Sequence, residues 1–149
     1  MNQYSDEYRI ERKLVVPSTA VAYLDWIRYF HPSQFQQTYP ERWINNIYFD
    51  TPTLNNFVEG VAGLNHRRKI RVRWYGQNWE KATKPNLEIK EKTNFFGKKQ
   101  KYRLRDFDFH KLPGRGTARY FLDSVETTFP EVLNMALVDL KPTLFNRYF

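Results

Sequence analysis

The sequence predicts an α+β fold in which an antiparallel β-sheet curls into a polar-lined barrel or tunnel, with helices packed outside. Two observations support this prediction. First, four segments alternate charged and apolar residues with the two-residue period of a β-strand, and helical patterns lie among the strands. Second, all four place their cations on one parity and their apolar residues on the other, so a curled sheet would enclose the charged side chains.

Length and composition indicate a single folded domain. Aromatic residues make up 17% of the 149 residues, which is enough for a packed core. The chain has no cysteine, which excludes disulfide bonds, thiolate metal sites and cysteine nucleophiles. The first residues lack the apolar stretch of a signal peptide, and no apolar run is long enough to cross a membrane. We therefore expect a soluble, cytoplasmic protein.

The net charge of +8 is concentrated in the middle of the chain. Residues 67–105 hold 14 of the 24 lysines and arginines but only 3 of the 16 acidic residues. Such a basic segment predicts an anionic partner: a phosphate compound, a nucleic acid or an anionic membrane surface.

The first part of the chain predicts two strands, each followed by a helix. Residues 8–16 alternate as a strand, and a packing helix over residues 18–30 follows with Ser18 as its N-cap. Residues 43–49 form the next predicted strand, and residues 50–52 form a turn into a short helix. The apolar side of that helix contains Leu54, Phe57, Val58 and Val61.

Residues 66–75 give the clearest strand, because cations alternate there with β-branched and aromatic residues. Neighbouring cations on its charged face would lie about 7 Å apart. Each such pair would repel by about 0.6 kcal/mol in water, but by about 2.4 kcal/mol in a cavity with a dielectric constant near 20. This strand alone does not decide whether its charged face is a solvated surface or an anion-binding site. The charged face is Lys69, Arg71 and Arg73, and the apolar face is Ile70, Val72 and Trp74.

The rest of the chain predicts a hairpin, helices and a last strand. Residues 87–105 form the hairpin, with its turn at residues 93–98. Residues 117–140 have helical spacing in two pieces broken near Pro130, and residues 141–149 form the last strand. The charged positions of the hairpin strands are Glu88, Lys90, Lys92, Lys99, Lys101, Arg103 and Arg105.

Five motifs follow one another in these segments: Arg9-Ile-Glu11-Arg-Lys13, Asn46-Ile-Tyr48-Phe49-Asp50-Thr51-Pro52, Arg68-Lys-Ile-Arg71-Val-Arg73-Trp-Tyr75-Gly76, Leu87-Glu88-Ile-Lys90 and Lys101-Tyr-Arg103. In order and spacing they resemble the polyphosphate polymerase (VTC) domain, a branch of the CYTH-like triphosphate tunnel metalloenzymes. The turn, the R-x-R strand and the E-x-K strand are specific in combination, whereas each alone is weak. The resemblance covers nearly the whole chain.

The resemblance implies an antiparallel barrel whose lumen binds a triphosphate or polyphosphate chain. Carried over by position, the phosphate-binding residues would be Lys13, Arg71, Arg73, Lys90, Lys101, Arg103 and Tyr148. Lys13, Arg71, Arg73 and Lys90 would be catalytic, because they would position phosphates and neutralise their charge. Glu11 and Glu88 would face a divalent metal, Mn²⁺ or Mg²⁺, or would orient neighbouring cations.

The chain departs from the family pattern in two ways. Arg9 stands where the thiamine-triphosphatase and adenylate-cyclase relatives have the first Glu of an E-x-E-x-K signature, which favours the polymerase-type branch. The sequence stops one residue after Tyr148, where the family continues with an Arg and further strands. We therefore expect residues 1–149 to form a single domain with a partial, incomplete tunnel. Because unpaired strands invite pairing, a homodimer could form through the open sheet edges.

The favoured hypothesis is metal-dependent transfer of the terminal phosphate of a nucleoside triphosphate such as ATP to a polyphosphate chain, performed by the complete domain. An inorganic triphosphatase, with water as the acceptor, and a non-catalytic polyphosphate-binding module are the alternatives. Nucleic-acid binding is a more distant alternative. The strand aromatics lie on the parity opposite the cations, so we expect no stable nucleic-acid complex.

Overall fold

The computed structural model describes residues 17–20, 22–32, 36, 39–94, 96–112, 118–128, 130–131, 137 and 139–149. These residues belong to two units, Met1–Glu41 and Arg42–Phe149. The first unit contains a 3-10 turn, η1 (Ser18–Ala20), and a helix, α1 (Ala22–Phe30), where the sequence predicts a helix. Tyr23, Trp26 and Phe30 of α1 are exposed, and the packing role predicted for this helix stays a prediction. The strand predicted at residues 8–16 lies outside the described residues.

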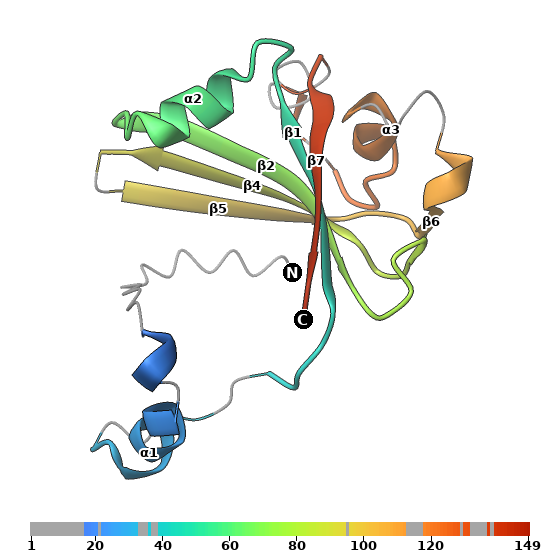
Figure 1. Ribbon diagram of the computed structural model, residues 1–149. Coiled ribbons are helices and arrows are strands. Elements are labelled where there is room, and N and C mark those ends of the chain that lie inside the picture. The colour runs from blue at the N-terminus through green and yellow to red at the C-terminus, as the bar shows by residue number, and fades with distance from the viewer. Residues whose placement is uncertain are drawn as a thin grey trace. The chain divides into compact units, whose positions relative to one another are not determined.

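The second unit is organised around a five-stranded antiparallel sheet in the order β5-β4-β2-β1-β7 (Figure 1), which confirms the α+β class. All five strands lie where the sequence predicts strands, and β3 and β6 pair as a separate two-stranded ribbon. The strands are β1 (Ile44–Asp50), β2 (His66–Tyr75), β3 (Lys81–Ala82), β4 (Asn86–Thr93), β5 (Phe96–Arg103), β6 (Phe107–Asp108) and β7 (Lys141–Tyr148). The helical elements are α2 (Asn55–Val61), η2 (Phe109–Lys111) and α3 (Ala118–Asp123).

The apolar parity predicted for the strands forms the hydrophobic core. Ile70, Val72 and Trp74 of β2 are at most 2% exposed, and Ile89 of β4 is fully buried. Partners in an antiparallel pair share one face of the sheet, so the pairing of Ile70 with Ile89 extends the apolar layer across strands. The cationic parity of the same strands consequently lies on the opposite face.

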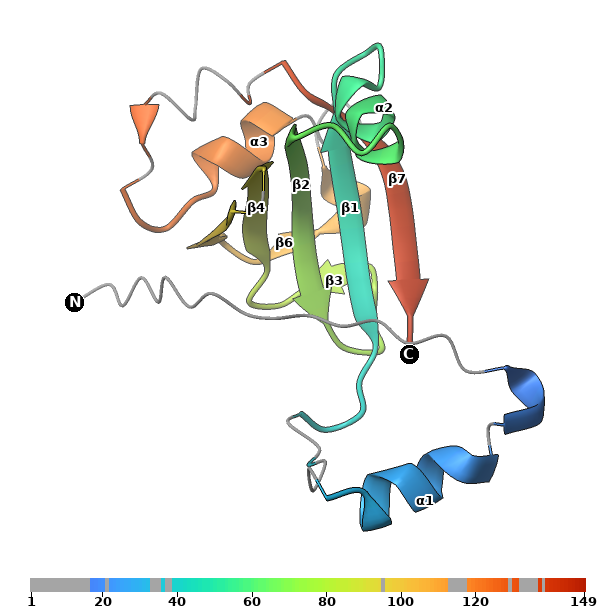
Figure 2. The same cartoon turned by 90° about the vertical axis from the view of Figure 1, so that its left-hand side faces the viewer.

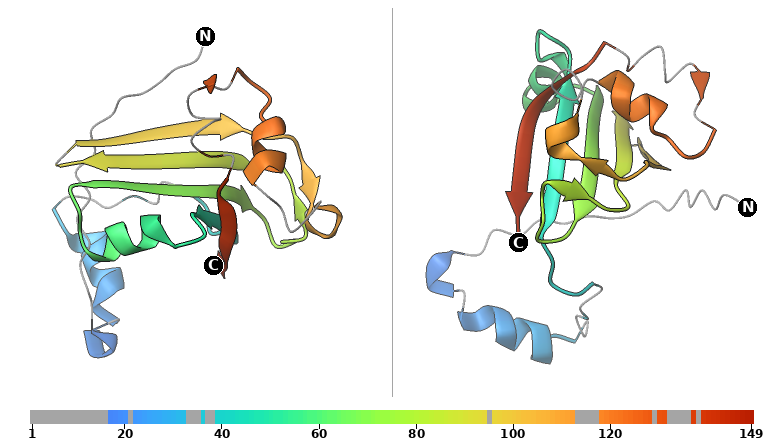
Figure 3. Two further views of the ribbon diagram at one scale, coloured as in Figure 1. Left: turned by 90° about the horizontal axis from the view of Figure 1, so that it is seen from above. Right: turned by 90° about the vertical axis from the view of Figure 1, so that its right-hand side faces the viewer.

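Helix α3 and the β3–β6 ribbon cover the apolar face. The ring centroid of Phe107 in β6 lies 5.4 Å from that of Trp74 and 5.2 Å from that of Phe121 in α3. Both contacts are edge-on, the geometry that the charge distribution of aromatic rings favours. Helix α2 lies on the other side of the sheet. It is in front of the strands in Figure 2, and it is behind them in the right-hand view of Figure 3, where α3 faces the viewer.

Helix α2 covers one end of the cationic face. It packs against β2 and β1, and a Cβ atom added at Gly60 would lie 3.8 Å from Cε of Lys69. The predicted apolar side of α2 is exposed at Phe57, Val58 and Val61. The predicted packing of helices outside, on the apolar side of the sheet, therefore holds for α3, whereas α2 lies on the cationic side.

The sheet does not close into a barrel within the described residues. Its edge strands β5 and β7 pair with one neighbour each, β4 and β1. The predicted partial tunnel is therefore not confirmed, and the strand predicted at residues 8–16 lies outside the described part of the chain. In that described part, no helix has the length and apolar character needed to cross a bilayer.

The hairpin between β4 and β5 is tighter than predicted. Thr93 pairs with Phe96, so β5 begins at Phe96 and not at residue 99. Asn94 adopts a φ of 55°, a left-handed conformation that asparagine tolerates well in tight turns. Gly97 suggests a turn in the sequence, but it lies within β5 opposite Lys92. The predicted turn at residues 93–98 is therefore too long.

Helix α3 is shorter than predicted. It ends at Asp123, and the chain then returns to the sheet: the backbone N–H of Glu126 donates to the carbonyl oxygen of Arg103 at 3.0 Å. An isolated bridge also joins Leu104 to Val125. This pairing continues the edge of the sheet beyond β5 and overrides the local helical preference. Most of the second predicted helical piece lies outside the described residues.

Asp50, the last residue of β1, fixes the start of α2. It is 5% exposed, and its carboxylate accepts backbone N–H bonds from Thr51 at 2.7 Å and from Asn56 and Phe57 at 2.9 Å. A negative charge at this end of a helix is also favoured by the helix dipole. Leu54, directly before the helix, has a φ of 57°, so the turn enters the helix through a left-handed residue.

Replacing Asp50 with alanine should lower the free energy of unfolding by about 2–4 kcal/mol, because three backbone N–H groups lose their acceptor. Chemical denaturation would measure the change. Asp50→Asn keeps one carbonyl oxygen as an acceptor and should lose about half as much.

A suitable control is Asp106→Ala, which removes an exposed carboxylate that accepts one bond, from Lys84 N at 2.7 Å. If Asp50→Ala destabilises the chain no more than this control, Asp50 does not hold α2 in place.

Candidate anion-binding site

The cationic face is built from adjacent positions on β2, β4 and β5. The antiparallel register arranges its side chains in three rows that cross the strands. Opposing residues in such rows lie about 5 Å apart, so like charges there destabilise the sheet unless an anion compensates them. The rows hold seven cations and one acid: Lys69–Lys90–Lys99, Arg71–Glu88–Lys101 and Arg73–Asn86–Arg103.

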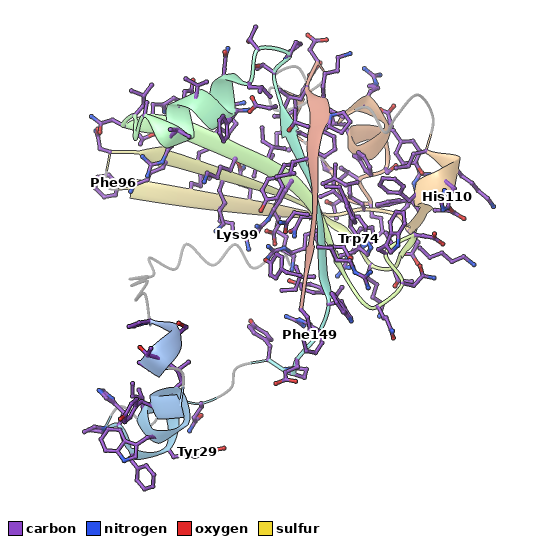
Figure 4. All side chains as sticks on the ribbon, in the orientation of Figure 1. Tyr29, Trp74, Phe96, Lys99, His110 and Phe149 are labelled. Carbon is purple, nitrogen blue, oxygen red and sulfur yellow. The ribbon has the colours of Figure 1, made fainter. Side chains whose placement is uncertain are left out.

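Glu88, in the middle row, pairs with cations from both neighbouring strands. Its Oε2 accepts hydrogen bonds from Nε of Arg71 at 2.9 Å and from Nη2 at 2.6 Å. Its Oε1 lies 3.1 Å from Nζ of Lys99. The Glu88 side chain is 4% exposed and that of Lys99 is 48% exposed, so the carboxylate is buried between the cations that it holds. Figure 4 shows Lys99 and Trp74 on opposite sides of the sheet.

The pKa shifts of Arg71 and Glu88 both favour the charged forms of these groups. Burial alone would raise the pKa of Glu88, but the hydrogen bonds and charges of Arg71 and Lys99 hold that pKa below its ordinary value of 4.5. Burial would likewise lower the pKa of Arg71, but the hydrogen bonds to Glu88 and Tyr48 raise it above its ordinary value. Each charge is therefore stabilised by the other.

Polar side chains of β1 and β7 fix the direction of the two arginines. Nε of Arg73 donates to Oδ1 of Asn46 at 2.7 Å, and its Nη2 donates to the hydroxyl of Tyr148 at 3.1 Å. Asn46 is fully buried, and its amide also donates to a backbone oxygen of β7 at 3.5 Å. One row away, Nη1 of Arg71 donates to the hydroxyl of Tyr48 at 3.2 Å.

The structure brings together most of the residues that the sequence predicts for phosphate binding. Tyr148 reaches Arg73 from β7. The guanidinium of Arg103 donates to the carbonyl oxygen of Lys84 and so points toward the end of the face. Lys13 and Glu11 lie outside the described residues, and their roles stay predictions. The predicted residues that share the cationic face are Arg71, Arg73, Glu88, Lys90, Lys101 and Arg103.

Sequence reasoning missed Lys99, Tyr48 and Asn46 as members of the site. Lys99 has the same parity as Lys101, and that parity could have found it. Tyr48 and Asn46 are uncharged, and only the pairing of β1 with β2 shows that they lie opposite Arg71 and Arg73.

This arrangement can hold a polyanion through charge-assisted hydrogen bonds. Lys69 and Lys101 are exposed, and neither has an ion-pair partner in the described part of the chain. Each charge-assisted contact to a phosphate contributes about 1.5–3 kcal/mol, so a few converging cations suffice for micromolar binding. The described residues contain no group of three histidines or acids that could hold a metal ion.

Replacing Glu88 with glutamine should lower the free energy of unfolding by about 2–3 kcal/mol at neutral pH, because bonds between charged groups are lost. The pKa of Glu88 is lower in the folded chain than in the unfolded chain. Its stabilising contribution is therefore complete above pH 4.5 and is lost as the pH falls below that value. Urea denaturation should show the difference between wild type and Glu88→Gln shrinking in acid, whereas a difference independent of pH would contradict the pairing.

Comparison with known proteins places the chain in a family. Residues 8–149 match the VTC domain, which confirms the resemblance seen in the sequence. The chain is also similar to phosphatidylinositol 3-kinase pik3 of Schizosaccharomyces pombe, with 26% identity over 126 residues. That match covers 78% of this chain but only 16% of the length of the relative. Membership in the family implies a role related to polyphosphate. The chain belongs to the VTC domain family, the CYTH-like domain associated with polyphosphate polymerases.

Proposed function

We propose that the cationic face of β2, β4 and β5 binds triphosphate or polyphosphate. The observation that carries this proposal is the alignment of seven cations in three adjacent rows with Glu88 as their one acid. Glu88 and Asn86 separate the cations in two of the rows, and a chain of phosphates could span all three rows and contact cations of each. Family membership supports a phosphate polymer as the anion.

In the complete protein, we propose that this site transfers the terminal phosphate of ATP to a polyphosphate chain. An oxygen at the end of the polymer would form a bond to the γ-phosphorus as the bond from that phosphorus to the bridging β–γ oxygen breaks, and ADP would leave. Arg71, Arg73, Lys90 and Lys13 would hold the phosphates in line and neutralise their charge. The reaction needs no covalent nucleophile, which agrees with a site made of cations.

The divalent metal, Mn²⁺ or Mg²⁺, stays a prediction. Such ions prefer carboxylate oxygens as ligands. Both oxygens of Glu88 already contact Arg71 or Lys99, so Glu88 does not fit as a ligand in this arrangement. Glu11 lies outside the described residues. We therefore derive no step that depends on a metal.

Two alternative functions would also bind phosphate chains on the cationic face, and a third would bind nucleic acid there. Water in place of the polymer as acceptor would make the protein a triphosphatase, and binding without turnover would make it a polyphosphate-binding module. Nucleic-acid binding would need aromatic rings beside the cations on which bases could stack. Trp74 is fully buried on the opposite face, but Tyr48 and Tyr148 lie beside Arg71 and Arg73, so nucleic-acid binding stays a distant alternative.

Removing cations from the face should strongly weaken triphosphate binding. Arg71→Ala with Arg73→Ala deletes both arginines but leaves Glu88 short of a partner, so this variant is also expected to be less stable. Arg73→Ala with Lys101→Ala leaves the pair of Glu88 and Arg71 intact and tests binding in a stable fold. Each pair of substitutions should weaken affinity at least about a hundredfold, because two charge-assisted contacts are lost. Calorimetric titration with inorganic triphosphate would measure the affinities.

The matched control is Arg68→Ala with Arg119→Ala, which removes the same charge from positions off the cationic face. Arg68 pairs with Glu91 at 3.4 Å and Arg119 pairs with Asp123 at 3.2 Å. If this control weakens triphosphate binding as much as the variants of the face, the binding is not located there. Incubation of the chain with ATP and Mn²⁺ or Mg²⁺ then separates the functions: polymer growth supports transfer, phosphate release supports hydrolysis, and neither supports binding alone.

We also propose that two copies of the chain pair through β7. The other edge strand of the described sheet, β5, carries Lys98, Lys99 and Lys101, so two copies of it would repel. Strand β7 instead exposes Leu144 and Phe145, at 56% and 40%. Sedimentation velocity should detect a dimer that Leu144→Lys shifts toward the monomer. A chain that is monomeric at every concentration tested would rule this pairing out.

A further inference from the structure

Glu88 is the one acidic residue in the three rows of the cationic face, and the proposed function does not explain its presence. A site that binds polyanions gains nothing from a negative charge among its cations, because that charge repels the ligand. Glu88 is nevertheless buried, and both of its carboxylate oxygens have interaction partners. Its two carboxylate oxygens take hydrogen bonds or an ion pair from Arg71 and Lys99.

The contacts of Glu88 compete with those a phosphate would make. Arg71 donates to Glu88 through Nε and Nη2, the edge of the guanidinium that presents two parallel donors to a carboxylate or phosphate. Its Nη1 donates to Tyr48. Lys99 directs its ammonium at the other carboxylate oxygen. An incoming phosphate must therefore displace Glu88 from these donors or share them with it.

We propose that Glu88 is the internal counter-ion of the anion site and that its charge limits the affinity of the face for phosphate chains. This inference rests on the proposed function and differs from the metal-binding role that the sequence suggests for Glu88. In the absence of ligand, Glu88 stabilises the packed cations. When ligand is present, it competes for Arg71 and Lys99, and longer chains with more phosphate charges overcome that competition better than short ones.

The test compares Glu88→Gln with Glu91→Gln, two substitutions on β4 that remove the same charge. The glutamine side chain introduced by Glu88→Gln would keep a carbonyl oxygen as an acceptor for Arg71, so the variant changes charge more than geometry. Glu91 contacts Arg68 at 3.4 Å and has the parity opposite Glu88, so it lies off the cationic face. Isothermal titration with inorganic triphosphate, in chelator and at fixed ionic strength, measures binding without any metal.

Glu88→Gln should bind triphosphate about tenfold more tightly than wild type and with a steeper dependence on salt, whereas Glu91→Gln should change affinity by less than about twofold. Loss of structure alone would weaken binding, so a gain in affinity separates the counter-ion role from a purely structural one. Unchanged or weaker metal-free binding by folded Glu88→Gln overturns the inference. So does a variant that loses only a Mn²⁺-dependent part of the affinity, because that result identifies a metal ligand.

A second comparison keeps the inference testable if Glu88→Gln does not fold. In a Lys99→Gln background, Glu88→Gln leaves only Arg71 uncompensated, and it should still strengthen triphosphate binding at least about threefold over Lys99→Gln alone. Equal or weaker binding contradicts the inference. If wild type does not bind triphosphate, the proposed function fails, and Glu88→Gln decides the inference alone: binding by the variant supports it and no binding overturns it.

Discussion

The two-residue period of a β-strand is the constraint on which the rest of this structure depends. On β2 it assigns Val72 and Trp74, both fully buried, to the core and assigns Arg71 and Arg73 to the cationic face. One segment thus supplies both the packing that makes the sheet rigid and the donors that could meet a ligand. A slip of one residue in the pairing of β2 would move cations into the core, so core packing helps to protect the register of the site.

This period is a local property, and for that reason the sequence predicts it well. Arg71, Arg73 and Lys101 were found on the correct face, and so were the apolar partners that fill the core. Register is not local, because it depends on where each turn lies. Gly97 looked like part of the β4–β5 turn but lies in β5, so the pairing that brings Lys99 to Glu88 could not be derived from the sequence. For the same reason, the sequence does not predict the contacts of Tyr48 and Asn46 with the arginines, because those contacts depend on the pairing of β1 with β2.

The helices show a second limit of sequence reasoning. The pattern after Ala118 is helical, yet the chain leaves the helix at Asp123 because its backbone pairs with the end of β5. The Asp50-Thr51-Pro52 motif also gains a physical explanation: Asp50 accepts three backbone N–H bonds at the start of α2. A motif that marks the family is therefore accounted for by the architecture of a turn, and it needs no contact with a ligand.

The contact of Arg73 with Tyr148 has a consequence for the order in which the molecule folds. Arg71 and Glu88 are 17 residues apart, and both lie on strands that are neighbours in the sheet. Arg73 and Tyr148 are 75 residues apart, and their contact requires β7 to be paired with β1. Contacts between distant residues require the closure of long loops and generally form late. We therefore expect the Arg71 half of the site to form by early pairing of neighbouring strands, and the direction of Arg73 to be fixed later, when β7 pairs with β1.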